Sequence, residues 1–308
     1  MATPVTDALA WVVVVGFAAS AALDVAGERP RAERAARGVA GVTWLAFGVF
    51  WALLVPHYAF VQKSFIESAG SAIAAPLSLY VGYLVWTRRP SLLFLSRAIA
   101  VMGLIYLPFQ TIEPLRQYTV ETVTVHSAWL VEQLGFDPII ASDAEASAVD
   151  RGYQGVLMIV EPGNPPAEWV TPVLLACSGI GSIATVSGLV LAVREPLRKR
   201  LAALAVVVPV IYGLNIVRVA FIVLGFSKQW FQIFVPQTMA AFGTTRPIMV
   251  SYYWADRIIA QSLSVVVLLA MIWGLLRYLP GLTVYVEEVA YLLTGREIDV
   301  GERLGGPE

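Results

Sequence analysis

The sequence has few of the residues on which soluble enzymes and nucleic-acid-binding proteins usually depend. Charged residues make up only 14% of its 308 residues, the net charge is −1, and there are two histidines and one cysteine. A single cysteine excludes an intramolecular disulfide, and a net charge near zero gives no support to nucleic-acid binding. We find no metal-ligand spacing, phosphate-cradling glycine loop or internal repeat, so the sequence predicts neither a metal nor an organic cofactor.

Long apolar runs dominate what is present, since 58% of the residues are hydrophobic. A bilayer core of about 30 Å needs roughly 20 apolar helical residues. The first run lacks the basic flank of a cleaved signal peptide, so we expect it to remain as a span. We therefore expect an all-α polytopic membrane protein, one membrane-embedded domain over 1–308. Its predicted spans are 8–25, 39–61, 70–87, 95–113, 172–193, 201–226 and 258–279.

Basic residues are concentrated in alternate connections between these spans, where the positive-inside rule places the cytoplasm. The N-terminus is then outside the cell and the C-terminus inside, with 281–308 as a cytoplasmic tail. Lysine supplies only three of the 21 basic residues, and the polar loops are acidic, a bias that favours a salt-loving host. The basic residues in or next to these alternate connections are Arg29, Arg31, Arg34, Arg37, Arg88, Arg89, Arg97, Arg194, Arg198, Lys199 and Arg200.

The predicted outer loop 114–171 is too long for a bare connection and is expected to form a small subdomain. Within it, residues 119–134 place Val123, His126, Leu130 and Leu134 at helical spacing, which predicts a helix on the outer surface. The short apolar runs 138–141 and 156–160 have turn-forming residues between and after them, and could pair as a hairpin.

The only cysteine, Cys177, lies near the outer start of the fifth predicted span, where Thr171 and Pro172 resemble a helix N-cap and first helical residue. Small residues at four-residue steps, including Gly181 and Gly188, would let neighbouring helices approach closely. A lone membrane cysteine often acts only as a small buried hydrophobe. Its meaning therefore depends on which residues lie beside it.

Two arginines fall at the same predicted outer interface as Cys177. Arg218 lies inside the sixth span, where a charge costs about 2.5 kcal/mol or more unless it is satisfied, so by default it marks a functional site. Asn215 precedes it on the same helical face and could orient it. Arg257 opens the seventh span, where an arginine is ordinary and the adjacent Asp256 could be its partner. Snorkelling to the interface is the structural alternative for Arg218.

Together, these residues suggest a cysteine nucleophile. Guanidinium groups near a thiol favour the thiolate and can stabilise an oxyanion, but an arginine cannot serve as a general base. We therefore expect Arg218 and Arg257 to lower the pKa of Cys177. A proton is still needed by a leaving amine. Ser178, Asp256 and His126 are candidates for supporting roles, although His126 is also explained as a surface residue.

The segments CSGIGS and NIVRV, followed by an arginine at the start of the next span, resemble the exosortase/archaeosortase family. The motif-bearing part is roughly 170–260. Bacterial members usually carry histidine at the third position, whereas ADRII places Arg257 there, which is the archaeal pattern. The resemblance implies that Cys177 is the nucleophile, and that Arg218 and Arg257 activate it and stabilise charge.

The resemblance also implies a substrate and a location. The expected activity is that of a membrane-embedded cysteine transpeptidase whose active site faces the outside of the cell membrane. Its partners would be surface proteins, such as the S-layer glycoprotein, that end in a Pro-Gly-Phe motif, a transmembrane segment and a basic tail. The new C-terminus would become attached to a membrane lipid, with a lipid amine or water as the acceptor.

Two other functions fit the same residues. A thiol-dependent lipid acyltransferase would use Cys177 on a thioester but act on an acyl lipid instead of a peptide. A non-enzymatic anion transporter would bind its cargo at Arg218 and would not need Cys177. The sequence shows no inverted repeat or pair of broken helices, which argues against the transporter.

Overall fold

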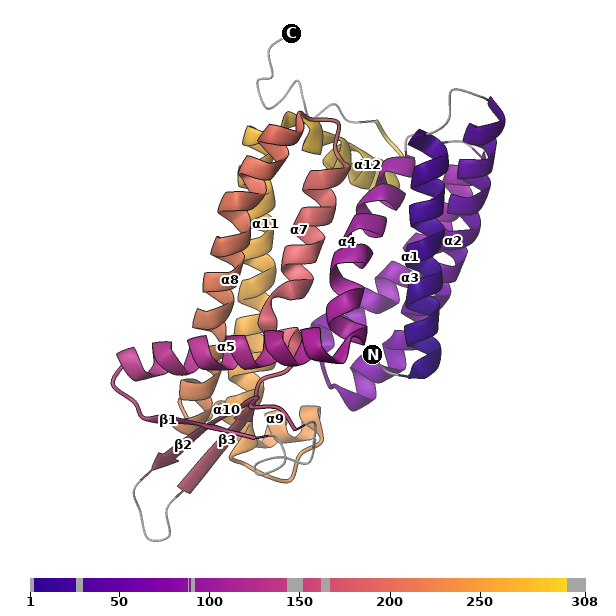
Figure 1. Cartoon of the computed structure of the whole chain (residues 1–308). Helices are drawn as coiled ribbons and strands as arrows, with labels where there is room; N and C mark the ends of the chain where they lie inside the picture. The colour runs from indigo at the N-terminus through magenta and orange to yellow at the C-terminus, as the bar shows by residue number, and fades with distance from the viewer. Residues whose placement is uncertain are drawn as a thin grey trace. The chain divides into compact units, whose positions relative to one another are not determined.

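The computed structural model describes residues 3–25, 30–87, 89, 92–142, 152–161 and 167–297. Arg29 and Arg88, and parts of the predicted outer loop and tail, lie outside these residues. The chain forms two compact units. Unit 1 comprises residues 1–107, 184–207 and 268–308, and unit 2 comprises residues 108–183 and 208–267. The fold is largely helical with one small sheet (Figure 1), which confirms the predicted class of all-α polytopic membrane protein.

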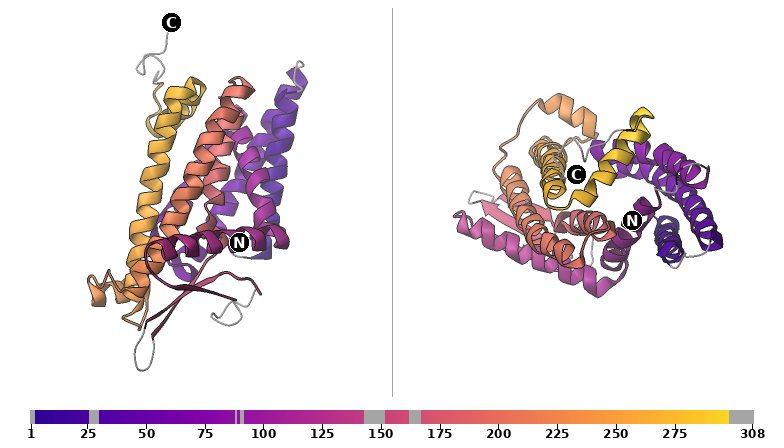
Figure 2. Two further views of the ribbon diagram at one scale, coloured as in Figure 1. Left: turned by 60° about the vertical axis from the view of Figure 1, so that its left-hand side comes forward. Right: turned by 90° about the horizontal axis from the view of Figure 1, so that it is seen from above.

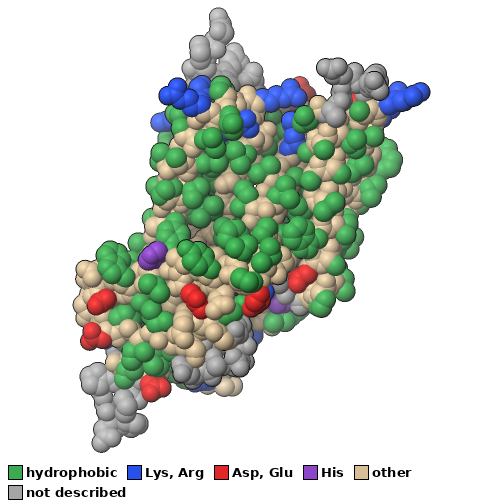
Figure 3. Space-filling model, viewed as in Figure 1, with side chains coloured by type: hydrophobic (Ala, Val, Ile, Leu, Met, Phe, Trp, Pro, Cys, Tyr) green, Lys and Arg blue, Asp and Glu red, His purple; other side chains and the backbone are tan. Residues whose placement is uncertain are grey.

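Six helical segments of the described chain are long and apolar enough to cross a membrane. Many of their large side chains are exposed, including Val206, Val266 and Leu269. Such side chains suit a surface that faces lipid, because lipid tails are as apolar as they are. On the face drawn in Figure 3, hydrophobic side chains are accordingly abundant over the middle, while Lys and Arg gather at the top and Asp and Glu in the lower part. The segments are Pro4–Val25, Arg31–Val61, Phe65–Thr87, Leu93–Thr111, Leu197–Ser227 and Met249–Tyr278, which confirm six of the predicted spans.

Unit 1 is built around three antiparallel helices at the start of the chain. These are α1 (Pro4–Val25), α2 (Pro30–Pro56, extended by a π-helical turn to Val61) and α3 (Phe65–Thr87). Helix α2 packs against both of its neighbours (Figure 2). Helix α4 (Leu93–Thr111) begins in unit 1 and crosses into unit 2 at Pro108.

The fifth predicted span is shorter than expected. Helix α7 (Ile180–Ala192) has 13 residues, about 20 Å, and residues 172–179 are not part of it. Thr171 and Pro172 end a β-strand instead of capping a helix, so that prediction was wrong. The prediction of close helix packing is confirmed at Gly188, where an added Cβ would lie 2.5 Å from the Ala98 carbonyl oxygen of α4.

The predicted cytoplasmic tail, 281–308, includes a packed helix, α12 (Thr283–Thr294). The nearly buried Glu288 of α12 pairs with Arg89, with 2.8 Å between Nε and Oε2. Tyr285 donates a hydrogen bond from its hydroxyl to the Leu189 carbonyl of α7, at 3.1 Å. The start of the tail is therefore part of unit 1.

Unit 2 contains the predicted outer-loop subdomain. Helix α5 (Glu113–Gln133) confirms the predicted surface helix, and β1 (Pro138–Ala141) pairs antiparallel with β2 (Val156–Glu161), which confirms the hairpin. A third strand that the sequence analysis missed, β3 (Ala167–Pro172), pairs antiparallel with β2. The sheet lies against α5 (Figure 2).

The buried face of α5 differs from the predicted one. Val123 is buried as expected, but His126 and Leu134 are exposed. The buried face includes the small polar residues Thr124 and Ser127, which allow α5 to lie close to its neighbours. The core of unit 2 joins α5, β2 and α8 (Leu197–Ser227) through Val123, Ala128, Val131, Leu157, Ile159, Val173, Ile216, Val219, Ala220, Val223 and Leu224.

Candidate active site

Cys177 lies in a short 3-10 turn, Leu175–Ser178, between strand β3 and helix α7. Its backbone N–H donates to the Leu174 carbonyl at 2.8 Å. Ser178 closes the turn, because its hydroxyl donates to the Leu175 carbonyl at 2.6 Å and accepts from the Ile180 N–H at 3.3 Å. The described contacts thus give Ser178 a structural role in fixing the cysteine.

Gly179 ends this turn in the left-handed region, with φ of 75°. Other residues rarely adopt that conformation, so glycine here lets the chain change direction before α7 starts. An added Cβ would also lie 3.1 Å from the Asn215 Cβ of α8. Glycine at 179 therefore serves both the turn and the close approach of α8.

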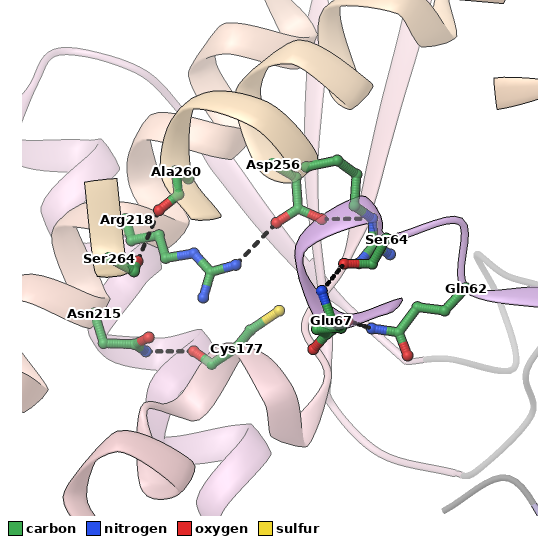
Figure 4. Close-up of polar contacts among 10 residues, drawn as sticks. Gln62, Ser64, Glu67, Cys177, Asn215, Arg218, Asp256, Ala260 and Ser264 are labelled. Atoms are coloured by element: carbon green, nitrogen blue, oxygen red, sulfur yellow. Dashed lines mark hydrogen bonds and ion pairs between the residues drawn. The ribbon is translucent and has the colours of Figure 1, made fainter. Parts of the chain in front are cut away.

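Asn215 holds the backbone of the cysteine. Its side-chain Nδ2 donates a hydrogen bond to the Cys177 carbonyl (Figure 4). The sequence analysis expected Asn215 to orient Arg218, so the residue was identified but its contact was not. Because Asn215 is nearly buried, the bond is shielded from water and should restrict the position of the thiol.

Arg218 and Arg257 share one carboxylate, that of Asp256. The Arg218 Nη2 lies 3.1 Å from Asp256 Oδ1, and the Arg257 Nε lies 3.3 Å from Asp256 Oδ2. The Asp256 side chain is only 8% exposed, so both ion pairs are shielded from solvent. In Figure 4 the Cys177 side chain points toward the side of this cluster where Arg218 meets Asp256. The structure thus brings all three predicted catalytic residues together in unit 2.

Asp256 and Arg257 belong to a π-helical turn, Tyr253–Ala260, between α10 (Met249–Tyr252) and α11 (Gln261–Tyr278). Adjacent residues of an ordinary α-helix do not face each other, and π-helical turns are frequent at functional sites. Ala255 in this turn is buried. A Cβ added to Gly225 of α8 would lie 3.3 Å from the Ala255 Cβ. The glycine lets α8 come close enough for Arg218 to reach Asp256.

The electrostatics of Cys177 differ from the expected lowering of its pKa. Cys177 precedes α7 and lies outside the helices long enough to span a membrane. Burial raises the pKa of its thiol most, and the negative charge of Asp256 raises it further. Arg218, the backbone hydrogen bond at Leu174 and Arg257 lower it, but the pKa stays above its ordinary value. The shared carboxylate offsets the effect of the two arginines.

Tyr252 lies beside this cluster, whereas the described contacts of His126 are elsewhere. Tyr252 is an electrostatic neighbour of Asp256, which places a proton-bearing hydroxyl beside the cluster. His126 instead pairs with Tyr212 of α8, with 2.6 Å between Nδ1 and the hydroxyl oxygen. The described contacts of His126 therefore do not include Cys177, Arg218 or Arg257.

The described residues contain no group of three or more His, Cys, Asp or Glu side chains that could hold a metal ion. The cluster of Arg218, Asp256 and Arg257 is instead suited to holding an anion or a developing negative charge. A guanidinium group presents several donors in a planar fork, and Arg218 Nε is buried without a hydrogen-bond partner in the described structure. Arg218 thus has a donor that does not contact Asp256.

Comparison with known proteins identifies the class to which this fold and site belong. The chain belongs to the transmembrane exosortase family, which it matches over residues 6–246. That segment includes Cys177 and Arg218 and ends before Arg257. The chain is therefore a multi-pass membrane protein of a family of sorting enzymes.

Individual relatives narrow the resemblance to archaeosortase A and extend it over Arg257. The protein of that name from Haloferax volcanii is 39% identical, and the alignment covers 97% of this chain and 98% of the relative. Archaeosortase A from Natronomonas pharaonis is also 39% identical, over 93% of this chain and 88% of the relative. No solved structure matches the chain.

Proposed function

We propose that this chain is a membrane-embedded cysteine transpeptidase that processes the C-termini of surface proteins. Its substrates carry a tripartite signal of a Pro-Gly-Phe motif, a transmembrane segment and a basic tail, and the S-layer glycoprotein is the expected principal client. The site faces the outside of the cell membrane. Cleavage leaves a new C-terminus that becomes attached to a membrane lipid.

The observation that carries this proposal is the arrangement of Cys177 with the Arg218–Asp256–Arg257 cluster. A thiol fixed by a tight turn points toward the ion pair of Arg218 and Asp256, a carboxylate that Arg257 also contacts, in a shielded part of unit 2. In our proposal Cys177 Sγ attacks the scissile carbonyl, and a guanidinium group holds the oxyanion that forms. Fixed donors in a site with little water stabilise such a charge far better than water does.

The proposed reaction proceeds through a thioester. The thiol loses its proton, a carbon–sulfur bond forms, and the peptide C–N bond breaks as the leaving amine gains a proton. Asp256 and Tyr252 both interact electrostatically with Cys177 and are able to take up or supply these protons. A lipid amine or water then attacks the thioester carbonyl and regenerates the thiol.

The alternatives differ in what they require of these residues. A lipid acyltransferase would use the same thioester chemistry with an acyl-lipid donor. An anion transporter would bind its cargo at Arg218 and would not need Cys177. The Cys177 side chain points toward the Arg218–Asp256 ion pair, which favours an enzymatic role over transport.

Mass analysis of the C-terminus of a surface protein tests the proposal. Cells that produce this chain should yield a shortened, lipid-linked C-terminus, whereas cells with Cys177→Ala at the same protein level should accumulate the full-length precursor. A shortened protein in the Cys177→Ala cells would contradict the cysteine mechanism. Intact precursor together with a missing acyl group on another lipid or protein would favour the acyltransferase.

A further inference from the structure

Strand β3 is an edge of the sheet, because the described strands are ordered β1, β2, β3. One side of β3 pairs with β2 from Ala167 to Pro172, and no described strand pairs with the other side. An edge strand presents a row of backbone donors and acceptors that can pair with an extended peptide. β3 is thus a possible template for another chain.

The pairing with β2 determines which groups of β3 point outward. The Val173 N–H donates to the Gly155 carbonyl at 2.7 Å, so this residue pair is hydrogen-bonded across the two strands. Such pairs alternate along an antiparallel ladder, and residues between them direct their backbone groups away from the partner. The outward groups of β3 are therefore the N–H and C=O of Glu168 and Val170, and the C=O of Pro172.

The strand leads directly to the proposed nucleophile. Cys177 follows Pro172 by only five positions, a span of at most about 17 Å even if fully extended. Proline has no N–H, so a ladder on the outer side loses a donor where β3 ends. A peptide paired with β3 would therefore leave the sheet close to the turn that carries Cys177.

We propose that the outer edge of β3 binds the substrate segment preceding the scissile bond as an added β-strand. This inference rests on the proposed function, which requires an extended polypeptide to reach Cys177. The added strand runs parallel to β3, because β3 runs toward Cys177 and the substrate must also run from its outer domain toward the membrane. Backbone pairing of this kind makes binding depend little on the side chains before the signal.

Val170→Pro tests this binding mode, with Val170→Ala as the matched control. Proline removes the outward N–H and leaves the pairing of Trp169 and Thr171 with β2 in place, a change that edge strands tolerate. The assay uses the full chain in liposomes and a synthetic peptide with the complete sorting signal. We expect processing at low peptide concentration to fall about tenfold in Val170→Pro relative to Val170→Ala, the effect of one lost hydrogen bond.

Alkylation of Cys177 by a small thiol reagent should proceed at the same rate in both variants, since the nucleophile is unchanged. A second measurement varies the substrate instead of the enzyme. Single N-methylation of successive residues before the scissile bond should reduce processing at alternate positions, because only alternate N–H groups face β3. This scan also decides the question if Val170→Pro does not fold.

Equal processing by Val170→Pro and Val170→Ala would overturn the inference, as would N-methylation effects without a period of two. Cys177→Ala separates this failure from failure of the proposed function. If that variant is inactive, only the strand pairing has failed. If it still processes the peptide, the cysteine mechanism is wrong and the inference falls with it.

Discussion

Arg218 of α8 and Asp256 of the π-helical turn form an ion pair across 38 positions of the sequence, with 3.1 Å between Nη2 and Oδ1. Asp256 also contacts Arg257, so one carboxylate fixes the positions of both arginines. The same carboxylate opposes ionisation of Cys177. Asp256 therefore has two effects of opposite sign on the proposed chemistry, and they can be measured separately.

Asp256→Asn should make Cys177 more reactive and the enzyme less active. Loss of the negative charge lowers the pKa of the thiol, so alkylation at neutral pH should become faster than in the wild type. Processing should fall about tenfold or more, because the charged hydrogen bond that positions Arg218 contributes about 1.5–3 kcal/mol and the ion pair with Arg257 is lost as well. Alkylation rates across pH and the ratio of processed to precursor protein measure the two effects.

The control for this change is Glu132→Gln, which removes a charge from an exposed position of α5. It should leave both measurements unchanged. Wild-type Cys177 should alkylate more slowly than a free thiol at neutral pH, and its rate should rise with pH as the thiolate forms. An alkylation rate in Asp256→Asn equal to that of the wild type would refute the electrostatic role of Asp256.

Asn215→Leu should reduce activity because it removes the hydrogen bond that holds the backbone carbonyl of Cys177. Leucine keeps the branched shape of the side chain but has no donor, so the Cys177 carbonyl loses its partner at a cost of about 1–3 kcal/mol. Asn215→Ala should lose a comparable free energy, which would show that the effect comes from the missing hydrogen-bond donor. Thermal unfolding and processing should both report the change, whereas Leu214→Ala, at an exposed position of α8, should resemble the wild type. Full activity of Asn215→Leu would refute this role.

The sequence predicts most of the helical fold because long apolar runs admit few alternatives. It fails at residues 167–179, where a strand, a turn and the start of a helix follow one another. Val170, Val173 and Leu174 are apolar in either conformation, so hydropathy alone cannot separate a strand leading into a helix from one continuous helix. The position of Gly179 just after Cys177 is the local signal that could have located the break.

The sequence predicts which residues form the site but not how they contact one another. Cys177, Arg218 and Arg257 could be identified because their chemistry is unusual at the ends of apolar segments. The sharing of Asp256 could not, since it depends on the approach of α8 to a π-helical turn. In an α-helix, Asp256 and Arg257 would point in different directions, and ordinary helical spacing gives no sign of a π-helical turn.

The orientation inferred from the arginines remains a prediction, and single cysteines in a Cys177→Ala background can test it. Glu132→Cys in α5 and Gln237→Cys in α9 (Val235–Phe242) replace exposed residues of unit 2. Both should react with a membrane-impermeant thiol reagent in intact cells. Ala35→Cys, at an exposed position near the start of α2, should react only after the cells are opened. The reverse pattern would place the candidate site in the cytoplasm.

The two arginines should differ in which substitutes they accept. The sequence analysis placed Arg257 at the membrane boundary, where an arginine is ordinary, and predicted a catalytic role for it. Its side chain is 17% exposed, against 23% for Arg218, so solvent exposure does not separate the two residues. The two arginines differ in the atom that contacts Asp256. Arg218 reaches it through a terminal nitrogen, whereas Arg257 reaches it through Nε, which lies nearer the backbone. A shorter side chain with one ring N–H can replace an Nε contact but not a terminal one.

Arg257→His should therefore retain measurable processing, as the histidine of bacterial family members suggests, whereas Arg257→Ala should lose about 10²-fold or more. Arg218→Lys should be nearly as inactive as Arg218→Ala, because lysine offers a point charge on a flexible stem in place of a planar fork. The measurement is the ratio of processed to precursor surface protein at equal enzyme levels, so that misfolding is not counted as lost chemistry. An active Arg218→Lys together with an inactive Arg257→His would mean that the planar, multi-donor role belongs to Arg257.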